Sequence, residues 1–394
     1  MSRFDKEIDR TGTASIKWDR CRQKFGTDKQ LIPLWIADTD FEAPEQVTEA
    51  IIKRAEHRVY GYTFAMDSYK ECIQAWYQKR HQISIEKDWI SAGSSVVPTL
   101  YFSILAMTKP GDKVLLLTPA YEPFYEIIES SGRRIMDCPL LAGEDGSYRA
   151  DLEMMEKAML EGCRFLLFCN PHNPVGKVWS RQEIHEIAAL CRKYQVFVAS
   201  DEIHGELVLY GNRYTSILEE RELLQDRVAM YISAGKAFGM AGLDASSIII
   251  PGAEYRERIS QMLQNAGMKS QNIFGLAATQ AAYEHGESWL EEEIHYLEEN
   301  SRYVCHFIDT CMEQVKYAKH EGTFLMWLDM SCLGLEDEEL ARRIVNECRL
   351  GLGFGSHYGR RYGQYIRMNI GCRKSLLAQA MANLKDLYDK CCPD

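Results

Sequence analysis

The sequence predicts an α/β protein in which helices cover a mainly parallel sheet, together with a smaller α+β domain. Three observations carry this prediction. Short apolar runs of strand length recur between residues 112 and 251, stretches with helical spacing lie between them, and 394 residues allow about two or three domains. Because these runs are apolar throughout, both faces of the sheet are expected to be buried, as is usual for parallel strands.

Five apolar runs mark the expected strands, at residues 112–118, 164–170, 195–201, 228–233 and 246–251. A helix is predicted over 181–194, because Ile184, Ile187, Ala188 and Cys191 recur at helical spacing after Ser180, a residue type that caps helices. The apolar stretch 96–107 follows the small residues 93–95, which fits a helix with an open N-terminus.

The order of elements sets the expected domain boundaries. Residues 1–45 hold Pro33 and Pro44 and little periodicity, so they are expected to form an arm packed against a lobe and the active site. Residues 46–285 are expected to form the large domain and residues 286–394 the small one. The acidic segment 287–300 is predicted to be a solvated helix that leads out of the large domain.

Charge and composition favour a small-molecule ligand. The net charge is −11 and no block of basic residues occurs, which argues against nucleic acid. No run of about 18 apolar residues predicts a membrane span, and the charged first ten residues lack the core of a signal peptide, so a cytoplasmic location is expected. The 13 scattered cysteines lack metal-ligand spacing, so we expect reduced thiols and no metal site.

Polar residues cluster after the expected strands, where open α/β sheets bind ligands. Residues 93–95 could hold a phosphate on backbone N–H groups or merely cap a helix. Residues 170–176, with two Asn-Pro steps, predict a rigid turn that presents Asn173. Asp201 ends an apolar run, so it needs a cationic or N–H partner, unless it only caps a helix.

Two further cations have alternative interpretations. Lys236 follows the fourth strand beside Ala234 and Gly235, and it is either a solvated loop charge or a lysine that forms a Schiff base. Arg367 lies inside a strand-like run near the C-terminus. Its planar guanidinium suits a substrate carboxylate, and an internal ion pair explains it equally well.

In this order the segments resemble one family. TPAYEPFY, NPHNPVGKVW, SDEIH and the SxxK around Lys236 are similar to those of the fold-type I pyridoxal-phosphate enzymes of the aminotransferase class I/II superfamily. The resemblance extends from about residue 35 to residue 372, and it is strongest to the MalY/PatB-type cystathionine β-lyases, which are C-S lyases. The resemblance implies the fold of the fold-type I enzymes, a pyridoxal 5'-phosphate cofactor and an amino-acid substrate.

The resemblance also implies roles for single residues. Lys236 matches the lysine that binds the cofactor covalently, and Asp201 matches the partner of the pyridine nitrogen. Arg367 matches the arginine that holds the substrate carboxylate, and Tyr62 matches a tyrosine donated to the phosphate site of the other subunit of a homodimer. Other positions match cofactor contacts (Ser95, Val96, Tyr121, Asn173, His204, Ser233) or the arm that closes over the substrate (Trp35, Ala37, Asp38).

Two positions depart from the common aminotransferase pattern. His204 stands where aminotransferases usually carry tyrosine, which is similar to the C-S lyases. Asp244 stands where many relatives carry a phosphate-binding arginine. Because a carboxylate repels a phosphate, we expect Asp244 to point away from it.

The expected activity is β-elimination from cysteine thioethers, which yields pyruvate, ammonia and a thiol. An aminotransferase would use the same residues, and a ligand-responsive regulator on the same scaffold is a third, non-enzymatic possibility. The identity of the thioether depends on a pocket formed by the arm, Tyr121 and the small domain, and the sequence leaves it open.

Overall fold

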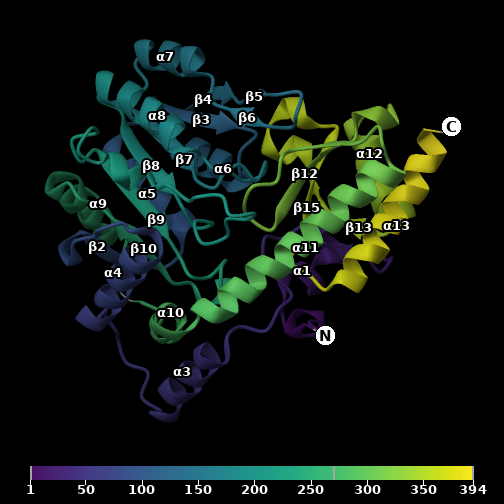
Figure 1. Cartoon of the computed structure of the whole chain (residues 1–394). Coiled ribbons are helices and arrows are strands. Elements are labelled where there is room, and N and C mark those ends of the chain that lie inside the picture. The colour runs from purple at the N-terminus through teal and green to yellow at the C-terminus, as the bar shows by residue number, and fades with distance from the viewer. Residues whose placement is uncertain (1, 269–270, 393–394) are drawn as a thin grey trace.

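The computed structural model describes residues 2–268 and 271–392, which form two lobes around two separate sheets. The larger lobe carries a seven-stranded sheet and the smaller lobe carries a four-stranded sheet. Figure 1 shows the small lobe in yellow and light green at the C-terminal end of the chain, with helix α11 (Glu287–Cys311) running from one lobe along the other.

The large sheet has the strand order β2-β10-β9-β8-β7-β3-β4, and β10 runs antiparallel to the other six strands. Its strands are β2 (Ile90–Gly93), β3 (Lys113–Thr118), β4 (Arg134–Pro139), β7 (Phe165–Cys169), β8 (Phe197–Asp201), β9 (Val228–Ile232) and β10 (Ser246–Ile249). The five predicted strands therefore appear within two residues of their expected ends. The sequence pattern missed β2 and the edge strand β4, whose mixed polar composition lacks an apolar run.

Alternate side chains of the large sheet enter two separate cores. In β3, Val114 and Leu116 face the core with α5, α6 and α9, whereas Leu115 and Leu117 face the core with α7 and α8. This burial on both faces explains the continuously apolar strands. The helices of this lobe are α3 (Glu45–Glu56), α4 (Asp67–His81), α5 (Val96–Met107), α6 (Glu122–Ser130), α7 (Leu152–Leu160), α8 (Arg181–Lys193), α9 (Ala253–Asn265) and α10 (Ile273–His285).

The small lobe pairs an antiparallel sheet, in the order β11-β12-β15-β14, with three helices. Its elements are β11 (Lys316–Tyr317), β12 (Leu325–Asp329), β14 (Gly353–Phe354), β15 (Tyr365–Asn369), α11, α12 (Asp337–Arg343), a π-helical turn (Ile344–Cys348) and α13 (Lys374–Cys391). Strands β5 (Leu141–Ala142) and β6 (Tyr148–Arg149) form a separate antiparallel pair.

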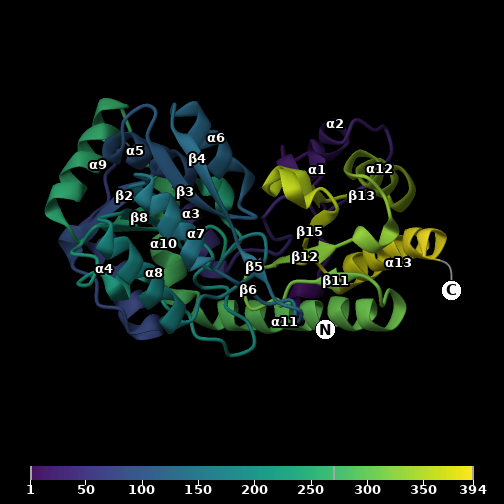
Figure 2. The same ribbon diagram turned by 90° about the horizontal axis from the view of Figure 1, so that it is seen from above.

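Residues 2–44 form an arm along the small lobe, and Figure 2 shows α1 (Ile16–Asp19) and α2 (Cys21–Lys24) of this arm on the side of the small lobe. Strand β1 (Ile32–Pro33) pairs in parallel with β13 (Leu350–Gly351). The fully buried Asn369 adds a second link, because its Nδ2 donates to the backbone oxygens of Ile36 and Asp38. The strand pair and the Asn369 side chain therefore both fix the arm to the small lobe.

Helix α11 differs from the expectation of a solvated helix. It continues to Cys311, and one face is buried through Trp289, Leu290 and Leu297. Most of its glutamates lie on the other face, although Glu293 is buried. The high net acidity of the segment therefore hid an amphipathic pattern. All 13 cysteines are free thiols. Within the described residues, no helix combines the length and apolarity needed to cross a membrane.

Candidate functional site

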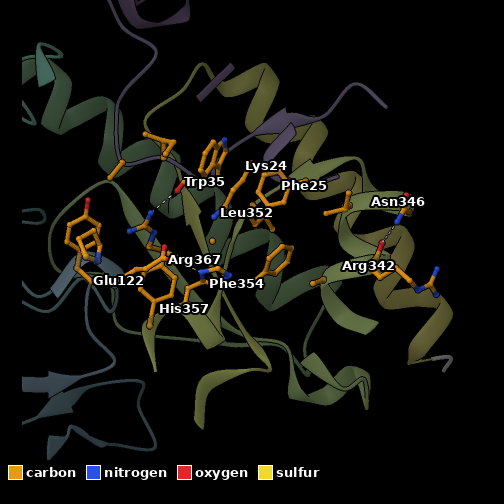
Figure 3. A pocket seen from close by; sticks show the side chains of 18 of the residues that line it. Lys24, Phe25, Trp35, Glu122, Arg342, Asn346, Leu352, Phe354, His357 and Arg367 are labelled. Carbon is orange, nitrogen blue, oxygen red and sulfur yellow. Dashed lines mark hydrogen bonds and ion pairs between the residues drawn. The ribbon is translucent and has the colours of Figure 1, made fainter. Parts of the chain in front are cut away.

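Two cavities meet at Lys236, at the ends of the central strands of the large sheet. The inner chamber has a volume of about 200 Å³ and is lined by the strand ends and the start of α5. The outer chamber, shown in Figure 3, has a volume of about 570 Å³ and is lined by the arm, the start of α6 and the small lobe. Lys236, Ala37 and Tyr121 line both chambers.

The structure brings most of the predicted site residues to these two chambers. Trp35 and Arg367 line the outer chamber only. The inner chamber alone receives the other six (Ser95, Val96, Asn173, Asp201, His204 and Ser233). These residues come from segments spread over more than 300 positions, so their meeting is a property of the fold.

Lys236 sits in the turn that follows β9, and the turn is tightly packed. A Cβ at Gly235 would come within 3.1 Å of the Ala241 Cα, which explains the small residue beside the lysine. Burial and the nearby charge of Arg367, opposed by the charges of Asp38 and Asp201, lower the pKa of Lys236 to about 8. A lysine with this pKa has a substantial neutral fraction near neutral pH, and the neutral amine is the form that acts as nucleophile and base.

Asp201 ends β8 and is almost fully buried, with 4% of its surface exposed. Its Oδ1 accepts a hydrogen bond from the Ile203 N–H at 3.1 Å. Burial nevertheless raises the pKa of Asp201 to about 7. One hydrogen bond offsets little of the cost of burying an ionised carboxylate. Asp201 therefore favours a cationic ligand in the inner chamber, because a cation would keep the carboxyl group ionised.

His204 lines the inner chamber three residues after Asp201. It is buried, and its Nδ1 has no hydrogen-bond partner among the described residues. Burial, together with the charges of Lys236 and Arg367, lowers the pKa of His204 to about 3. The ring is therefore neutral, and its free nitrogen can accept or donate one hydrogen bond depending on the tautomer.

Helix α5 opens on the inner chamber. Its first residue, Val96, and its second, Val97, line the cavity, and the N–H groups of a first helical turn have no partner within the helix. Ser95 does not cap these groups with its side chain. Ser233 also lines this end of the cavity, and its hydroxyl donates to the Ala245 backbone oxygen at 2.6 Å. N–H groups at a helix N-terminus with nearby hydroxyls suit an anion such as phosphate.

The expectation for Asp244 is wrong. Its side chain does not point away, since it lines the inner chamber and its Oδ1 accepts a hydrogen bond from Ser95 Oγ at 2.6 Å. Asp244 has a left-handed backbone conformation, with a φ of 47°. That turn directs the carboxylate towards the start of α5, so a negative charge sits beside the anion-binding N–H groups.

Arg367 is buried in β15 and held on several sides. Its Nη1 donates to Asn173 Oδ1 at 3.1 Å and its Nη2 donates to the Trp35 backbone oxygen at 2.7 Å. Its guanidinium lies 4.9 Å from the centre of the Tyr358 ring. Its Nε has no partner among the described residues, and no carboxylate is paired with it there, so the guanidinium is available to a ligand carboxylate.

Two predicted residues lie outside both chambers. Asp38 forms ion pairs with Arg10 at 2.9 Å and with the buried Lys17 at 3.5 Å. Its side chain therefore braces the arm and does not line a cavity. Tyr62 is 99% exposed and contributes to neither chamber of its own chain.

The motif search missed most of the outer chamber. Phe25, Phe354, His357 and Tyr358 line it, and no local pattern marks them as functional. Glu122 also lines it and lies within TPAYEPFY, although no role was expected for it. Asn369 was also missed, although its position two residues after Arg367 puts both on one face of β15. The amide of Asn369 within an otherwise apolar strand could have indicated a buried side chain with a specific hydrogen-bonding role.

Pyridoxal phosphate fits the inner chamber in three respects. Asp201 can pair with a protonated ring nitrogen, Lys236 offers an amine, and the start of α5, beside Ser233, offers N–H groups to a phosphate. Asp244 is the one unfavourable element. Within the part of the chain that the structure describes, Lys236 is the only cation that lines this chamber.

Comparisons with known proteins agree with this geometry. Residues 29–384 match the model of the family described as aminotransferase class I and II. The chain is 38% identical to cystathionine beta-lyase PatB of Bacillus subtilis, over 97% of this chain and 98% of that protein. It is 30% identical to protein MalY of Escherichia coli over 98% of each.

Solved structures give the same result. Cystalysin from Treponema denticola, which contains a pyridoxal 5'-phosphate cofactor, has a TM-score of 0.95 and 30% identity over 99% of each chain. A PLP-bound putative aminotransferase from Clostridium difficile has a TM-score of 0.95 and 33% identity over 98% of this chain and 100% of that one. The chain belongs to the aminotransferase class I and II family.

Proposed function

We propose that this protein is a pyridoxal-phosphate-dependent carbon-sulfur β-lyase that acts on cysteine thioethers such as cystathionine. The observation that carries the proposal is the placement of Lys236 between a buried carboxyl, Asp201, and an arginine with no carboxylate partner, Arg367. The name of the PatB relative, and that of a structural neighbour, the PLP-bound C-S lyase from Staphylococcus hominis, support the same chemistry.

Arg367, Lys236 and Asp201 have different roles in this reaction. Arg367 binds the substrate carboxylate and fixes the α-carbon beside Lys236. Lys236 removes the α-proton, and a thiolate then leaves the β-carbon with the electrons of the C–S bond. Pyridoxal phosphate, when bound, supplies a protonated ring that accepts the electrons from the α-carbon, and Asp201 keeps that ring protonated. Water converts the released aminoacrylate into pyruvate and ammonium.

An aminotransferase is the second candidate, favoured by the family description and by the name of the Clostridium difficile structure. Both reactions begin with removal of the α-proton by Lys236. A barrier difference of about 1.4 kcal/mol between the later steps changes the product ratio tenfold, so small differences in geometry decide the outcome.

The test is a product profile of the purified holoenzyme. We expect cystathionine or another cysteine S-conjugate to yield pyruvate, ammonia and thiol at least about ten times faster than any amino acid yields its keto acid in the presence of an acceptor. Mainly amino-group exchange with little pyruvate would replace the lyase with the aminotransferase. No turnover of either kind would favour the regulator.

The protein is further proposed to act as a cytoplasmic homodimer in which Tyr62 completes the phosphate site of the partner. Tyr62 belongs to an exposed apolar segment that also carries Val59, Tyr60, Phe64 and Met66. Such a patch is typical of an interface. Among the described residues, Lys236 is the only cation that lines the inner chamber of one chain, so a partner residue would add a contact to the phosphate.

Complementation tests this assembly. A Tyr62→Phe chain mixed with a Lys236→Ala chain should form heterodimers that each hold one intact site, so activity should rise above that of either variant alone. A fully active monomer at high dilution would contradict the proposal.

A further inference from the structure

We propose that the outer chamber receives the leaving thiol and selects cysteine S-conjugates whose thiol carries an apolar or aromatic body with an acidic group at its far end. This inference rests on the β-lyase function proposed above. It adds the class of thiol released and assigns Lys24 to its recognition.

The position of the chamber follows from the reacting groups. Arg367, which binds the substrate carboxylate, lines the outer chamber and not the inner one, and Lys236 lies where the two meet. The inner chamber, at about 200 Å³, is the space that fits the cofactor. The substituent on the substrate sulfur therefore extends into the outer chamber, whose volume of about 570 Å³ is ample for a small-molecule group.

The wall of the outer chamber is largely aromatic and aliphatic. Phe25 meets Trp35 edge-on at 5.6 Å between ring centres and meets Phe354 edge-on at 5.9 Å. Leu352 and Val345 extend this surface. Apolar side chains exposed in a cavity gain free energy when an apolar ligand group removes them from water. The wall thus favours a bulky apolar thiol.

The cationic and acidic residues of the outer chamber are mostly paired with one another or with nearby groups. His357 Nδ1 lies 2.6 Å from Glu122 Oε1, and the guanidinium of Arg342 donates two hydrogen bonds to Glu339 at 2.6 and 2.7 Å. Arg367 is committed to the substrate carboxylate. These pairs leave no net charge for a distal group to recognise.

Lys24 is different. It lines the chamber with its Nζ 5.8 Å from the centre of the Trp35 ring, and it takes part in none of the ion pairs formed by the described residues. Figure 3 shows it beside Trp35 and Phe25. An unpaired cation at the edge of an apolar wall favours a ligand with an apolar body and an anionic end, and it disfavours a cationic end.

The experiment compares L-cysteine S-conjugates that share one aromatic body. These are the S-benzyl, S-(para-carboxybenzyl) and S-(para-aminomethylbenzyl) compounds, with S-methyl-L-cysteine as the small reference. Pyruvate release by the holoenzyme gives kcat/KM for each. We expect the carboxylate conjugate to exceed the ammonium conjugate by about tenfold, since a solvent-exposed charge changes each affinity by a few-fold in opposite directions. We also expect S-benzyl to exceed S-methyl.

Two variants of Lys24 test the assignment. Lys24→Gln should reduce the carboxylate-to-ammonium ratio to about two, and Lys24→Glu should bring it below one. Arg22→Gln is the matched control, because Arg22 is an exposed cation on the same short helix and lines neither chamber. This control should keep the wild-type ratio.

The outcomes separate the two proposals. If S-methyl-cysteine and the other conjugates all fail to yield pyruvate, the β-lyase function itself is wrong. If they are cleaved without charge preference, or if the preference survives in both Lys24 variants, the function stands and the role of Lys24 is refuted. A smaller kcat/KM for S-benzyl than for S-methyl would refute the apolar leaving group.

Discussion

The inner and outer chambers share Lys236, but they are built from different kinds of structure. The inner chamber is formed by consecutive strand ends of one sheet and by the first turn of α5. The outer chamber is formed by segments at opposite ends of the chain, such as Phe25 from the arm and Phe354 from the small lobe. The inner chamber holds buried polar groups with few partners, whereas the outer chamber holds mostly apolar surface and paired charges. The first is suited to chemistry and the second to the choice of substrate.

This contrast predicts that the largest effects come from the inner chamber, and the largest of all from Lys236. Lys236→Ala should reduce turnover by a factor of about 10⁴ or more, because the same amine holds the cofactor and moves the proton. Borohydride reduction followed by mass spectrometry should find the cofactor attached to the Lys236 peptide of the wild type and to no peptide of the variant. An active alanine variant would remove Lys236 from the mechanism.

Substitution of Asp201 should cause the second-largest loss of turnover. Asp201→Ala should lower kcat by about 10²- to 10³-fold or more, because a neutral ring accepts electrons poorly. Asp201→Asn, which keeps the size of the side chain, should bind the cofactor and still be slow, whereas Asp201→Glu should retain part of the rate. Absorption spectra give cofactor content and pyruvate release gives kcat. Normal turnover by the asparagine variant would require another partner for the ring nitrogen.

Substitution of Asp244 should have an intermediate effect, which is expected on the affinity for pyridoxal phosphate and not on the rate of the reaction. Asp244→Asn removes the negative charge beside the start of α5 and keeps a residue type that tolerates the left-handed backbone. The dissociation constant of pyridoxal phosphate, measured by titration of the cofactor-free protein, should fall by about five- to tenfold.

The matched control for that measurement is Asp226→Asn. Asp226 also has a positive φ, of 56°, and it pairs with Arg221 outside both chambers. Its substitution should leave the dissociation constant unchanged. Weaker cofactor binding by Asp244→Asn would mean that the Ser95–Asp244 hydrogen bond organises the phosphate site.

The smallest effect is expected in the outer chamber, at the Glu122–His357 pair. The hydrogen bond with Glu122 raises the pKa of His357, and the same bond lowers the pKa of Glu122. A raised histidine pKa stabilises the fold below pH ~6.5 and this contribution is lost as pH rises through the raised value. A lowered glutamate pKa stabilises the fold above pH ~4.3 and this contribution is lost as pH falls through the lowered value.

The pair should therefore contribute most between about pH 4.5 and 6.5. Both side chains are 41% exposed, so solvent screening limits the contribution to about 0.5 kcal/mol. Glu122→Gln should lower the free energy of unfolding by that amount near pH 6 and by nothing near pH 9, as measured by denaturant titration. A deficit that grows towards pH 9 would refute the charged pair.

The same contrast explains what could be predicted from the sequence. Inner-chamber residues lie directly after apolar runs, so Asn173, Asp201 and Lys236 could be placed at one sheet edge from strand order alone. The outer chamber gives no such signal, because Phe25 and Phe354 meet only through tertiary packing. Asp244 was misplaced for a different reason, since charge repulsion was used to predict a direction that backbone geometry determines.

The pairing of β1 with β13, together with the hydrogen bonds from Asn369, has a mechanical consequence. These bonds join the arm and the small lobe into one structural unit, which carries Lys24, Trp35 and Arg367. Asp201 and Lys236 belong to the strand ends of the large lobe, on the other side of the site. A rotation of this unit relative to the large lobe would change the width of the outer chamber and, at the same time, the distance between Arg367 and Lys236. Binding of the substrate carboxylate by Arg367 is thus coupled to the width of the chamber around the leaving thiol.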